Sequence, residues 1–368
     1  MPKGTRGKRT KVDRPMVGVV GMGQMGLVCA AILADRSADE PETSAPHANM
    51  HRPVRVTLWS HDASEGDQVA RSRQSPRLPG FRLPAEVGVV AGDDGLEALR
   101  ECSVLVSAVP VQFTREVWSR AAAHVKPGAA IVSVAKGIEV KTLRRPTQIL
   151  AEALGDDPDK PARPLGVLSG PTIAGELARC LPATMVAASD DADLALTIQR
   201  LFGTRWLRVY TNQDVLGVEL AGAAKNVIAI AGGIIDGLQA GYNAKSALLS
   251  RGIAEIARLG VAMGASSATF FGIAGVGDLA TSCFSPEGRN RSCGEALGKG
   301  VKLKDYLKGT RGVVEGVWTA KALVRLAKKY RVDMPIAGAV HSVLFKGMDP
   351  IEAISGLMSR QQKAERVG

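Results

Sequence analysis

Short apolar runs alternate with helix-like stretches along the first half of the chain. Five runs are apolar enough to be buried strands, at residues 16–20, 54–59, 104–109, 129–134 and 165–168. Residues 27–34 and 113–124, which lie between them, are typical of helices packed on a sheet. This alternation predicts a doubly wound parallel sheet, in which ligands bind beyond the carboxyl ends of the strands.

The pattern changes after residue 213, where strand signals nearly vanish. Three long stretches now have helical spacing, at residues 215–238, 244–264 and 316–330. We therefore expect two domains, an α/β domain over residues 16–212 and an all-α domain over residues 213–368.

Two segments show neither the apolar runs of strands nor the spacing of helices. Residues 1–15 hold six basic residues against one aspartate. We expect a solvated, disordered tail there, and a targeting or nucleic-acid role is the alternative. Residues 35–53 are rich in Asp, Glu, Pro, Ser and His, which is typical of a surface insertion.

Composition narrows the class of protein. The chain has 368 residues, of which 45% are hydrophobic and 23% charged, a balance typical of a soluble globular protein with more than one core. Its five cysteines are irregularly spaced, so neither a zinc site nor a disulfide framework is indicated, and a reducing cytoplasm is expected. Uninterrupted apolar runs stay below the roughly 18 residues of a membrane span, and the N-terminus lacks a secretory signal.

A glycine-rich turn directly follows the first predicted strand. Gly21, Gly23 and Gly26 have the GxGxxG spacing and open the next helix, which is the context a dinucleotide-binding turn requires. The first glycine permits the turn, the second admits a pyrophosphate and the third lets the helix approach the strand. Free N–H groups at the helix N-terminus attract phosphate. The turn predicts an NAD or NADP site, with a turn used only for packing as the alternative.

The end of the second predicted strand leaves the choice between NAD and NADP open. An NAD site usually has an acid there that holds the ribose 2′-hydroxyl. In this chain the second predicted strand ends at Trp59 and Ser60, neither of which is acidic. The next residue, His61, could donate to a 2′-phosphate. The first acid, Asp62, lies slightly beyond the position at the strand end. We lean slightly towards NADP or dual use, although His61 could also be an ordinary surface residue.

Two lysines are candidates for proton transfer. Lys136 follows the strand at 129–134, at the edge where ligands bind. Lys225 lies in the apolar helix 215–238, where its ammonium must either reach solvent or face a cleft. A lysine can serve as an acid or base when burial or a neighbouring cation lowers its pKa.

A polar cluster follows in the second half. Asp278 could orient a lysine ammonium, and Arg289 could bind a phosphate through two parallel hydrogen bonds. Asn290 and a hydroxyl such as that of Ser282 could complete the phosphate site. A polar loop with an ordinary surface arginine is the alternative.

Taken together, the chain resembles the bacterial type of NAD(P)-dependent glycerol-3-phosphate dehydrogenases. The matching pieces run in order from residue 16 to residue 365 and are GMGQMG, VSAVPVQF, VAKG, LSGPT, GVELAGAAKNVIAI, GVGDL, GRNR, VVEG and the MPI…LMSRQQKAE ending. The resemblance is weaker at Gly175 and Gly288, and Ser282 stands where a threonine is frequent but keeps the hydroxyl. It implies a Rossmann-type domain followed by a helical domain, often as a homodimer.

The resemblance also implies roles for individual residues. Lys225 would be the proton donor and acceptor, with Lys136 and Asp278 as the other catalytic residues. The substrate contacts would be Lys136, Gly170, Thr172, Lys225, Asn226, Asp278, Ser282, Gly288, Arg289 and Asn290. The cofactor contacts would be Gly21, Gly23, Gln24, Met25, Gly26, His61, Lys136, Ala174, Arg289, Val313 and Glu315.

The implied reaction interconverts dihydroxyacetone phosphate and sn-glycerol 3-phosphate with NAD or NADP and no metal, and its product feeds phospholipid synthesis. We expect a small-molecule substrate, with no nucleic-acid partner and no membrane span. Two alternatives are a related dehydrogenase of a hydroxy acid such as 3-hydroxyisobutyrate or 6-phosphogluconate, and a nicotinamide sensor without catalysis. Retention of both lysines argues against the sensor.

Overall fold

The computed structural model describes residues 15–35, 54–310, 312–361 and 364. The predicted tail 1–15 and insertion 35–53 lie outside the described residues, apart from Pro15 and Asp35. Eight strands form one sheet, and they are Met16–Val20 (β1), Arg55–Ser60 (β2), Val87–Ala91 (β3), Cys102–Ser107 (β4), Ala130–Ser133 (β5), Leu165–Ser169 (β6), Ala183–Ser189 (β7) and Leu207–Asn212 (β8).

The strand order is β3-β2-β1-β4-β5-β6-β7-β8. The chain therefore reverses its direction of winding between β2 and β4, which flank β1, and a crevice for a ligand forms at such a point. The doubly wound sheet predicted from the sequence is confirmed. The expectation that every pair is parallel is wrong at one place, because β7 pairs with β6 in the antiparallel direction. The connection between these two strands contains only a five-residue helix rather than a full crossover.

Helices cover the sheet and fill the connections. In this part of the chain they are Gln24–Ala34 (α1), Ala63–Ser72 (α2), Asp94–Glu101 (η3), Val111–Ala121 (α3), Ala122–His124 (η4), Pro146–Ala153 (α4), Ala174–Ala178 (α5) and Ala192–Phe202 (α6). The apolar pattern does not single out β3, β7 and β8. Strand β8 lies at one edge of the sheet and carries exposed positions, so its sequence lacks a continuous apolar run. Strand β3 at the other edge is apolar throughout, with the sequence VGVVA, although the sequence analysis did not single it out.

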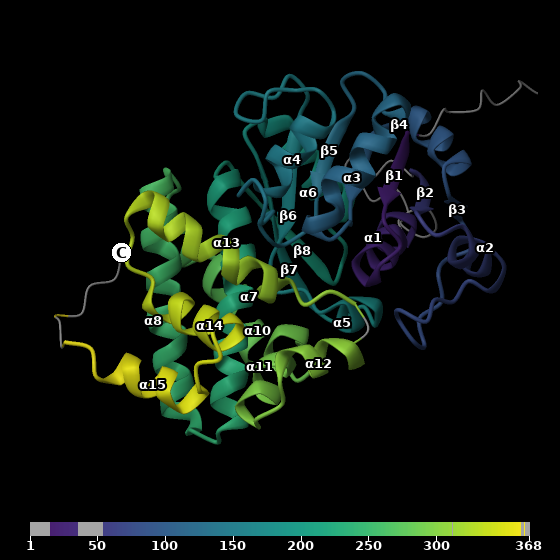
Figure 1. Ribbon diagram of the computed structural model, residues 1–368. Helices are drawn as coiled ribbons and strands as arrows, with labels where there is room; N and C mark the ends of the chain where they lie inside the picture. The colour runs from purple at the N-terminus through teal and green to yellow at the C-terminus, as the bar shows by residue number, and fades with distance from the viewer. Residues whose placement is uncertain (1–14, 36–53, 311, 362–363, 365–368) are drawn as a thin grey trace, which may run out of the picture.

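The second half is helical, as predicted. Its elements are Val215–Gly237 (α7), Gly241–Met263 (α8), Ser267–Phe270 (α9), Ile273–Gly277 (η5), Asp278–Phe284 (α10), Arg289–Gly298 (α11), Leu303–Gly309 (α12), Glu315–Tyr330 (α13), Pro335–Phe345 (α14) and Pro350–Met358 (α15). Helix α7 runs through the middle of this half and contacts α8, α10, α11, α13 and α14 (Figure 1). The predicted domain boundary near residue 213 falls between the end of β8 and the start of α7.

Helix α7 is the core helix of this half. Its length and mean hydropathy of 1.5 would allow it to cross a membrane, although polar residues interrupt its apolar run. However, 94% of its most apolar stretch is buried inside the protein. Burial of this kind is typical of a central helix in a globular core.

Helices α7 and α11 touch through their backbones at a glycine seam, formed by Gly233 and Gly237 on α7 with Gly294 and Gly298 on α11. A Cβ atom on Gly294 would lie 1.9 Å from the carbonyl oxygen of Ile230, and one on Gly233 would lie equally close to the carbonyl oxygen of Arg291. Because larger side chains do not fit, the seam fixes the start of α11 relative to α7.

A buried carboxylate joins the sheet half to α7. The side chain of Glu219 on α7 is fully buried and pairs with the guanidinium of Arg145. It also accepts hydrogen bonds from the backbone N–H and the hydroxyl of Thr147, each at 2.8 Å. Glu219 therefore caps the first turn of α4 from the other half of the molecule.

Candidate active site

The glycine-rich turn has the geometry that a dinucleotide requires. Gly21 adopts a φ of +107°, and a Cβ atom there would lie 2.9 Å from the carbonyl oxygen of Ala108. A Cβ atom on Gly26 would lie 1.8 Å from the carbonyl oxygen of Gly21. Helix α1 can therefore come this close to the turn only because residue 26 is a glycine. At Gly23 an added Cβ would meet nothing within 4 Å. The turn is thus closed on its inner side and open at the middle glycine, where a pyrophosphate would approach.

Helix α1 begins at this turn with its first N–H groups free of any side-chain cap. Such groups attract phosphate through hydrogen bonds and the partial positive charge of the helix N-terminus. The turn lies beyond the end of β1, at the reversal point of the sheet. These features fit a dinucleotide cofactor.

Two lysines and one aspartate form a second cluster, the lysine–aspartate cluster of Lys136, Lys225 and Asp278. The Nζ atom of Lys136 donates to Oδ2 of Asp278 at 2.7 Å, and that of Lys225 donates to Oδ1 at 2.6 Å. Lys136 also donates to the carbonyl oxygen of Gly170 at 2.8 Å and to the hydroxyl of Thr172 at 3.3 Å. One carboxylate therefore holds two ammonium groups side by side.

Local structure explains how these three side chains meet. Lys136 follows β5 at the carboxyl edge of the sheet, and Lys225 lies midway along α7. Asp278 opens α10 directly after the π-helical turn η5, a kind of turn that often occurs at functional sites. Lys225 also donates to the hydroxyl of Ser282, one turn further along α10.

Burial and charge shape the proton affinity of the cluster. The side chain of Asp278 is 1% exposed, that of Lys225 9% and that of Lys136 18%. Burial lowers the pKa of Lys136 to about 8; the charge of Asp278 opposes this change and that of Lys225 adds to it. A lysine with such a pKa can exchange a proton near neutral pH, and two ammonium groups can stabilise negative charge on a carbonyl oxygen.

Asn226 and Asn290 are bonded to each other. Nδ2 of Asn290 donates to Oδ1 of Asn226 at 2.9 Å, and Oδ1 of Asn290 accepts from the backbone N–H of Gly316 at 2.9 Å. Nδ2 of Asn226 in turn donates to the carbonyl oxygen of Lys136 at 3.5 Å. The two amides thus link the starts of α11 and α13 to the backbone of Lys136.

The first residue of α13, Glu315, lies next to Gly137, in the segment that follows β5. Its Oε2 atom would lie 3.2 Å from a Cβ atom on Gly137, and it is buried without a hydrogen-bond partner among the described residues. Burial raises the pKa of Glu315 to about 7, against the backbone N–H of Val111 and the charge of Arg289. An unpaired buried carboxyl oxygen at this edge of the sheet is available to a ligand.

Arg289 is exposed at the start of α11, next to Gly288. Its Nη1 atom would lie 2.9 Å from a Cβ atom on Gly312, so the backbone that leads through Val313 to Glu315 passes close to the guanidinium. The structure therefore brings Arg289, Val313 and Glu315 into one neighbourhood.

Four other predicted cofactor residues lie on α1, on α5 and after β2. Met25 on α1 and Ala174 on α5 pack against the same hydrophobic core beside the sheet. Gln24 donates from Nε2 to the carbonyl oxygen of Arg77 at 2.9 Å. His61 is exposed just after β2. The roles expected for all of these residues remain predictions.

One residue of this edge escapes the sequence analysis. Ser169, the last residue of β6, has a buried hydroxyl without a partner among the described residues. This oxygen would lie 3.1 Å from a Cβ atom on Gly222, which also faces the aliphatic part of Lys136. Its position at the end of a strand is the signal that could have found it.

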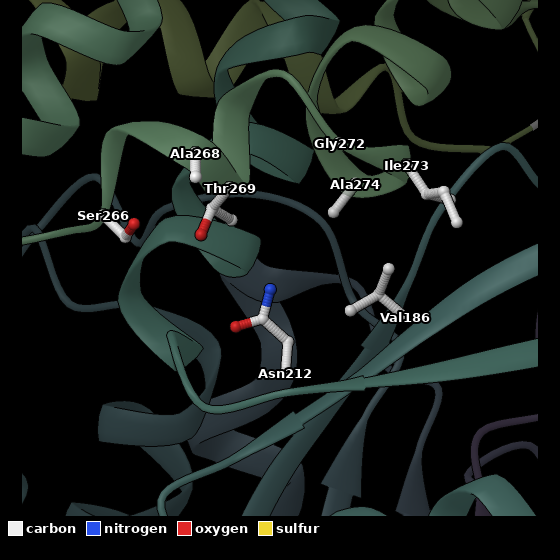
Figure 2. A pocket seen from close by; sticks show the side chains of 8 residues that line it. All are labelled: Val186, Asn212, Ser266, Ala268, Thr269, Gly272, Ile273 and Ala274. Atoms are coloured by element: carbon white, nitrogen blue, oxygen red, sulfur yellow. The ribbon is translucent and has the colours of Figure 1, made fainter.

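A separate hollow of about 260 Å³ lies between β7, β8 and the segment from α9 to η5 (Figure 2). It contains none of the predicted site residues. Val186, Ile273 and Ala274 give it apolar walls, and the side chain of Asn212 rises from β8 towards Thr269. The hydroxyl of Thr269 is already bonded to Asp214 at 2.6 Å.

The fold, the glycine-rich turn and the lysine–aspartate cluster together define a nicotinamide-dependent dehydrogenase, an oxidoreductase with a Rossmann-type domain. Family comparison makes the assignment narrower. Residues 16–195 match the N-terminal part of the NAD-dependent glycerol-3-phosphate dehydrogenases, and residues 214–355 match their C-terminal part. The chain belongs to this family.

Individual relatives agree with the family assignment. The chain is 41% identical over 350 residues to glycerol-3-phosphate dehydrogenase (NAD(P)+) 2 of Mycobacterium tuberculosis, which covers 95% of this chain and 98% of the relative. It is 44% identical over 349 residues to glycerol-3-phosphate dehydrogenase (NAD(P)+) of Geobacillus thermodenitrificans, with 94% and 95% covered. The crystal structure of glycerol-3-phosphate dehydrogenase from Coxiella burnetii superposes with a TM-score of 0.84 at 30% identity, covering 94% of this chain and 99% of that one.

Proposed function

We propose that the protein interconverts dihydroxyacetone phosphate and sn-glycerol 3-phosphate by hydride transfer. The observation that carries the proposal is the pairing of Lys136 and Lys225 with the one carboxylate of Asp278, at the edge of the sheet where a dinucleotide would bind. The relatives with the names given above support the same substrate pair.

NAD or NADP would supply or accept the hydride, bound over the glycine-rich turn. We propose that its contacts also include Gln24, Met25, His61, Lys136, Ala174, Arg289, Val313 and Glu315. Glu315 is favoured by its buried unpaired oxygen, and a carboxyl group of this kind can bond an amide N–H of a ligand.

The lysines would act on the carbonyl group of the substrate. Both ammonium groups lie close enough to share one carboxylate, so both can approach one carbonyl oxygen and stabilise its developing negative charge. During reduction, Lys225 would give a proton to this oxygen and regain one from solvent. Asp278 would orient both ammonium groups, and Ser282 would fix the direction of Lys225.

The substrate phosphate would bind at the start of α11. Arg289 is an exposed guanidinium that can form two parallel hydrogen bonds with a phosphate. Asn290 and Asn226 would help to place it, since their amides link the start of α11 to Lys136. Gly170 and Thr172 would contact the substrate from the side of Lys136, and Gly288 from the side of Arg289.

The test is an absorbance assay with dihydroxyacetone phosphate and either NADH or NADPH. We expect turnover by the full chain, and a loss on the order of 100- to 10,000-fold for Lys225→Ala, as for removal of an acid–base group. Lys245→Ala is the matched control, because Lys245 is also buried on a helix of this half but pairs with Asp236 instead. Near-normal turnover by Lys225→Ala would remove Lys225 from the mechanism, and turnover of a hydroxy acid alone would replace the proposed substrate.

We further propose that the protein works in the cytoplasm as a homodimer, and that its product supplies phospholipid synthesis. All five cysteines are free thiols, which suits a reducing compartment. Large exposed apolar side chains such as Tyr242 and Met358 offer contact area on the helical half. Light scattering of the purified chain tests the dimer directly.

A further inference from the structure

The corner beyond β2 is where a cofactor's adenosine ribose binds in a sheet of this kind. An acid there selects the 2′-hydroxyl of NAD, and an arginine nearby accommodates the 2′-phosphate of NADP. In this protein the corner is built from Ser60, the first turn of α2 and the segment 73–83 that follows α2. The sequence leaves the choice of cofactor open at this point.

The acid nearest the end of β2 already has a structural task. Asp62 is the N-cap of α2, and its Oδ1 atom accepts a hydrogen bond from the backbone N–H of Glu65 at 3.0 Å. Its own backbone N–H donates to the hydroxyl of Ser60 at 3.2 Å. These bonds hold the first turn of α2 against the end of β2.

Hydrogen bonds connect the segment after α2 to α1 on one side and to β3 on the other. Gln24, the first residue of α1 after the glycine-rich turn, donates to the carbonyl oxygen of Arg77 at 2.9 Å. Arg73 donates to the carbonyl oxygens of Val87 and Ala85 and so anchors the segment to the start of β3. Arg77 therefore lies between the glycine-rich turn and the first turn of α2.

Glu65 orients the guanidinium of Arg77 through two bonds. Nε of Arg77 donates to Oε1 of Glu65 at 2.6 Å, and Nη2 donates to Oε2 at 2.7 Å. The hydrogen bond to Glu65 raises the pKa of Arg77, and the negative charges of Glu65 and Asp62 add to this. Arg77 is thus close to Asp62, the second residue after β2.

The guanidinium keeps donors for a further ligand. Glu65 uses one edge of the planar group, and the remaining N–H groups, including those of Nη1, are free of that pair. The side chain of Glu65 is 12% exposed whereas that of Arg77 is 44% exposed. An arginine held on one edge by a carboxylate and open on the other can bind a phosphate without a further loss of side-chain freedom.

We propose that Arg77 recognises the 2′-phosphate of NADP, and that Glu65 is the positioning residue that aims its guanidinium. The inference rests on the proposed placement of the cofactor over the glycine-rich turn. It predicts that the protein accepts NADP through Arg77 and still accepts NAD, since the contact with Arg77 is additional to those of the turn.

The test is isothermal titration of the full-length chain with NADP+ and with NAD+, without substrate. We expect Arg77→Gln to weaken NADP+ binding by about 10- to 100-fold, as for the loss of a charge-assisted hydrogen bond. Binding of NAD+ should change by no more than about twofold, as for an exposed side chain outside the binding contacts. Arg77→Lys, which keeps the charge but loses the planar fork, should fall between wild type and Arg77→Gln.

Arg82→Gln is the matched control, because Arg82 is an exposed arginine of the same segment whose backbone forms a β-bridge with Gln74. It should leave the binding of both cofactors unchanged. Equal weakening of NAD+ and NADP+ by Arg77→Gln, or no weakening of NADP+, overturns the proposal. Since binding is measured without substrate, this outcome is independent of whether dihydroxyacetone phosphate is reduced.

Discussion

Asp278 accepts a hydrogen bond from Lys136 on one carboxylate oxygen and from Lys225 on the other. The orientation of both lysines therefore depends on the same carboxylate. The carboxylate is almost fully buried, and removing it would leave two ammonium groups facing each other. A single side chain thus holds both ammonium groups in place. Residue types alone predict such chemistry, but the sharing of one carboxylate depends on where three distant segments meet.

The lowered pKa of Lys136 predicts a pH dependence of the reduction. Its ammonium is charged below a pKa of about 8 and neutral above it, whereas an ordinary lysine stays charged to about 10.4. We expect kcat/KM for dihydroxyacetone phosphate to fall as the pH rises through about 8, because the carbonyl oxygen loses a stabilising charge. Rate profiles between about pH 6 and 10 check this expectation.

Lys136→Arg serves as the comparison, since a guanidinium stays protonated over this range. Its profile should lose the decline near pH 8, whatever its maximal rate. An unchanged decline in this variant would assign the ionisation to another group.

Glu315 predicts a pH dependence of stability. Burial raises its pKa in the folded protein to about 7, above the ordinary value of 4.5, so the folded state holds a proton that the unfolded state has lost. The free energy of unfolding should therefore fall as the pH rises from about 4.5 to about 7. Glu315→Gln, which carries no charge, should gain on the wild type over this window by up to roughly 3 kcal/mol.

Urea unfolding of the cofactor-free protein on both sides of the window measures the difference. A constant gap between Glu315→Gln and the wild type at both pH values would show that Glu315 keeps an ordinary pKa.

At the scale of elements, the glycine seam links the helix of Lys225 to the helix of Arg289. The sequence shows the glycines but not their partners, because helical spacing says which residues share a face and not which helix covers that face. The backbones of the two helices come close together at the seam, so we expect it to influence how far the proposed phosphate site lies from the proposed proton donor.

Gly294→Ala tests the seam. Its Cβ atom would lie 1.9 Å from the carbonyl oxygen of Ile230, so α11 must move away from α7. We expect a loss of about 1–3 kcal/mol of unfolding free energy, as for overpacking. The KM for dihydroxyacetone phosphate should rise, because α11 begins at Arg289, the proposed contact of the substrate phosphate.

Gly232→Ala is the control on the same helix, since its Cβ atom would make an ordinary contact at 3.4 Å with Cys283. It should keep the wild-type KM and change stability by no more than about 1 kcal/mol, the propensity difference between glycine and alanine. If Gly294→Ala behaves like Gly232→Ala, the seam does not position α11.

At the scale of the whole molecule, Glu219 connects the sheet half to the helical half. Glu219→Gln should leave the largely buried guanidinium of Arg145 without its ion partner. We expect this to cost about 3–5 kcal/mol of unfolding free energy, because an uncompensated buried charge remains. Urea unfolding followed by circular dichroism gives the value.

Glu101→Gln is the control for an exposed pair. Glu101 pairs with Arg55 at the surface, where both side chains are more than half exposed. Its removal should cost less than about 1 kcal/mol. Equal losses in the two variants would mean that burial does not strengthen the contact between the halves.

The sequence by itself determined the features that depend on neighbouring residues. Apolar runs predicted five of the strands, helical spacing predicted the long helices, and the glycine spacing predicted a turn of the kind that binds a dinucleotide. These signals are local, since a strand or helix shows its period within a few turns. The edge strand β8 has exposed residues between its buried ones, so it does not form an apolar run.

Only the tertiary structure decided which distant residues meet. Asp278 lies 142 residues from Lys136 and 53 from Lys225, yet it bonds both. The amide pair of Asn226 and Asn290 and the contact of Arg77 with Glu65 likewise join separate elements. These contacts depend on how the helices pack against the sheet. The periodicity of the sequence does not show which elements pack together.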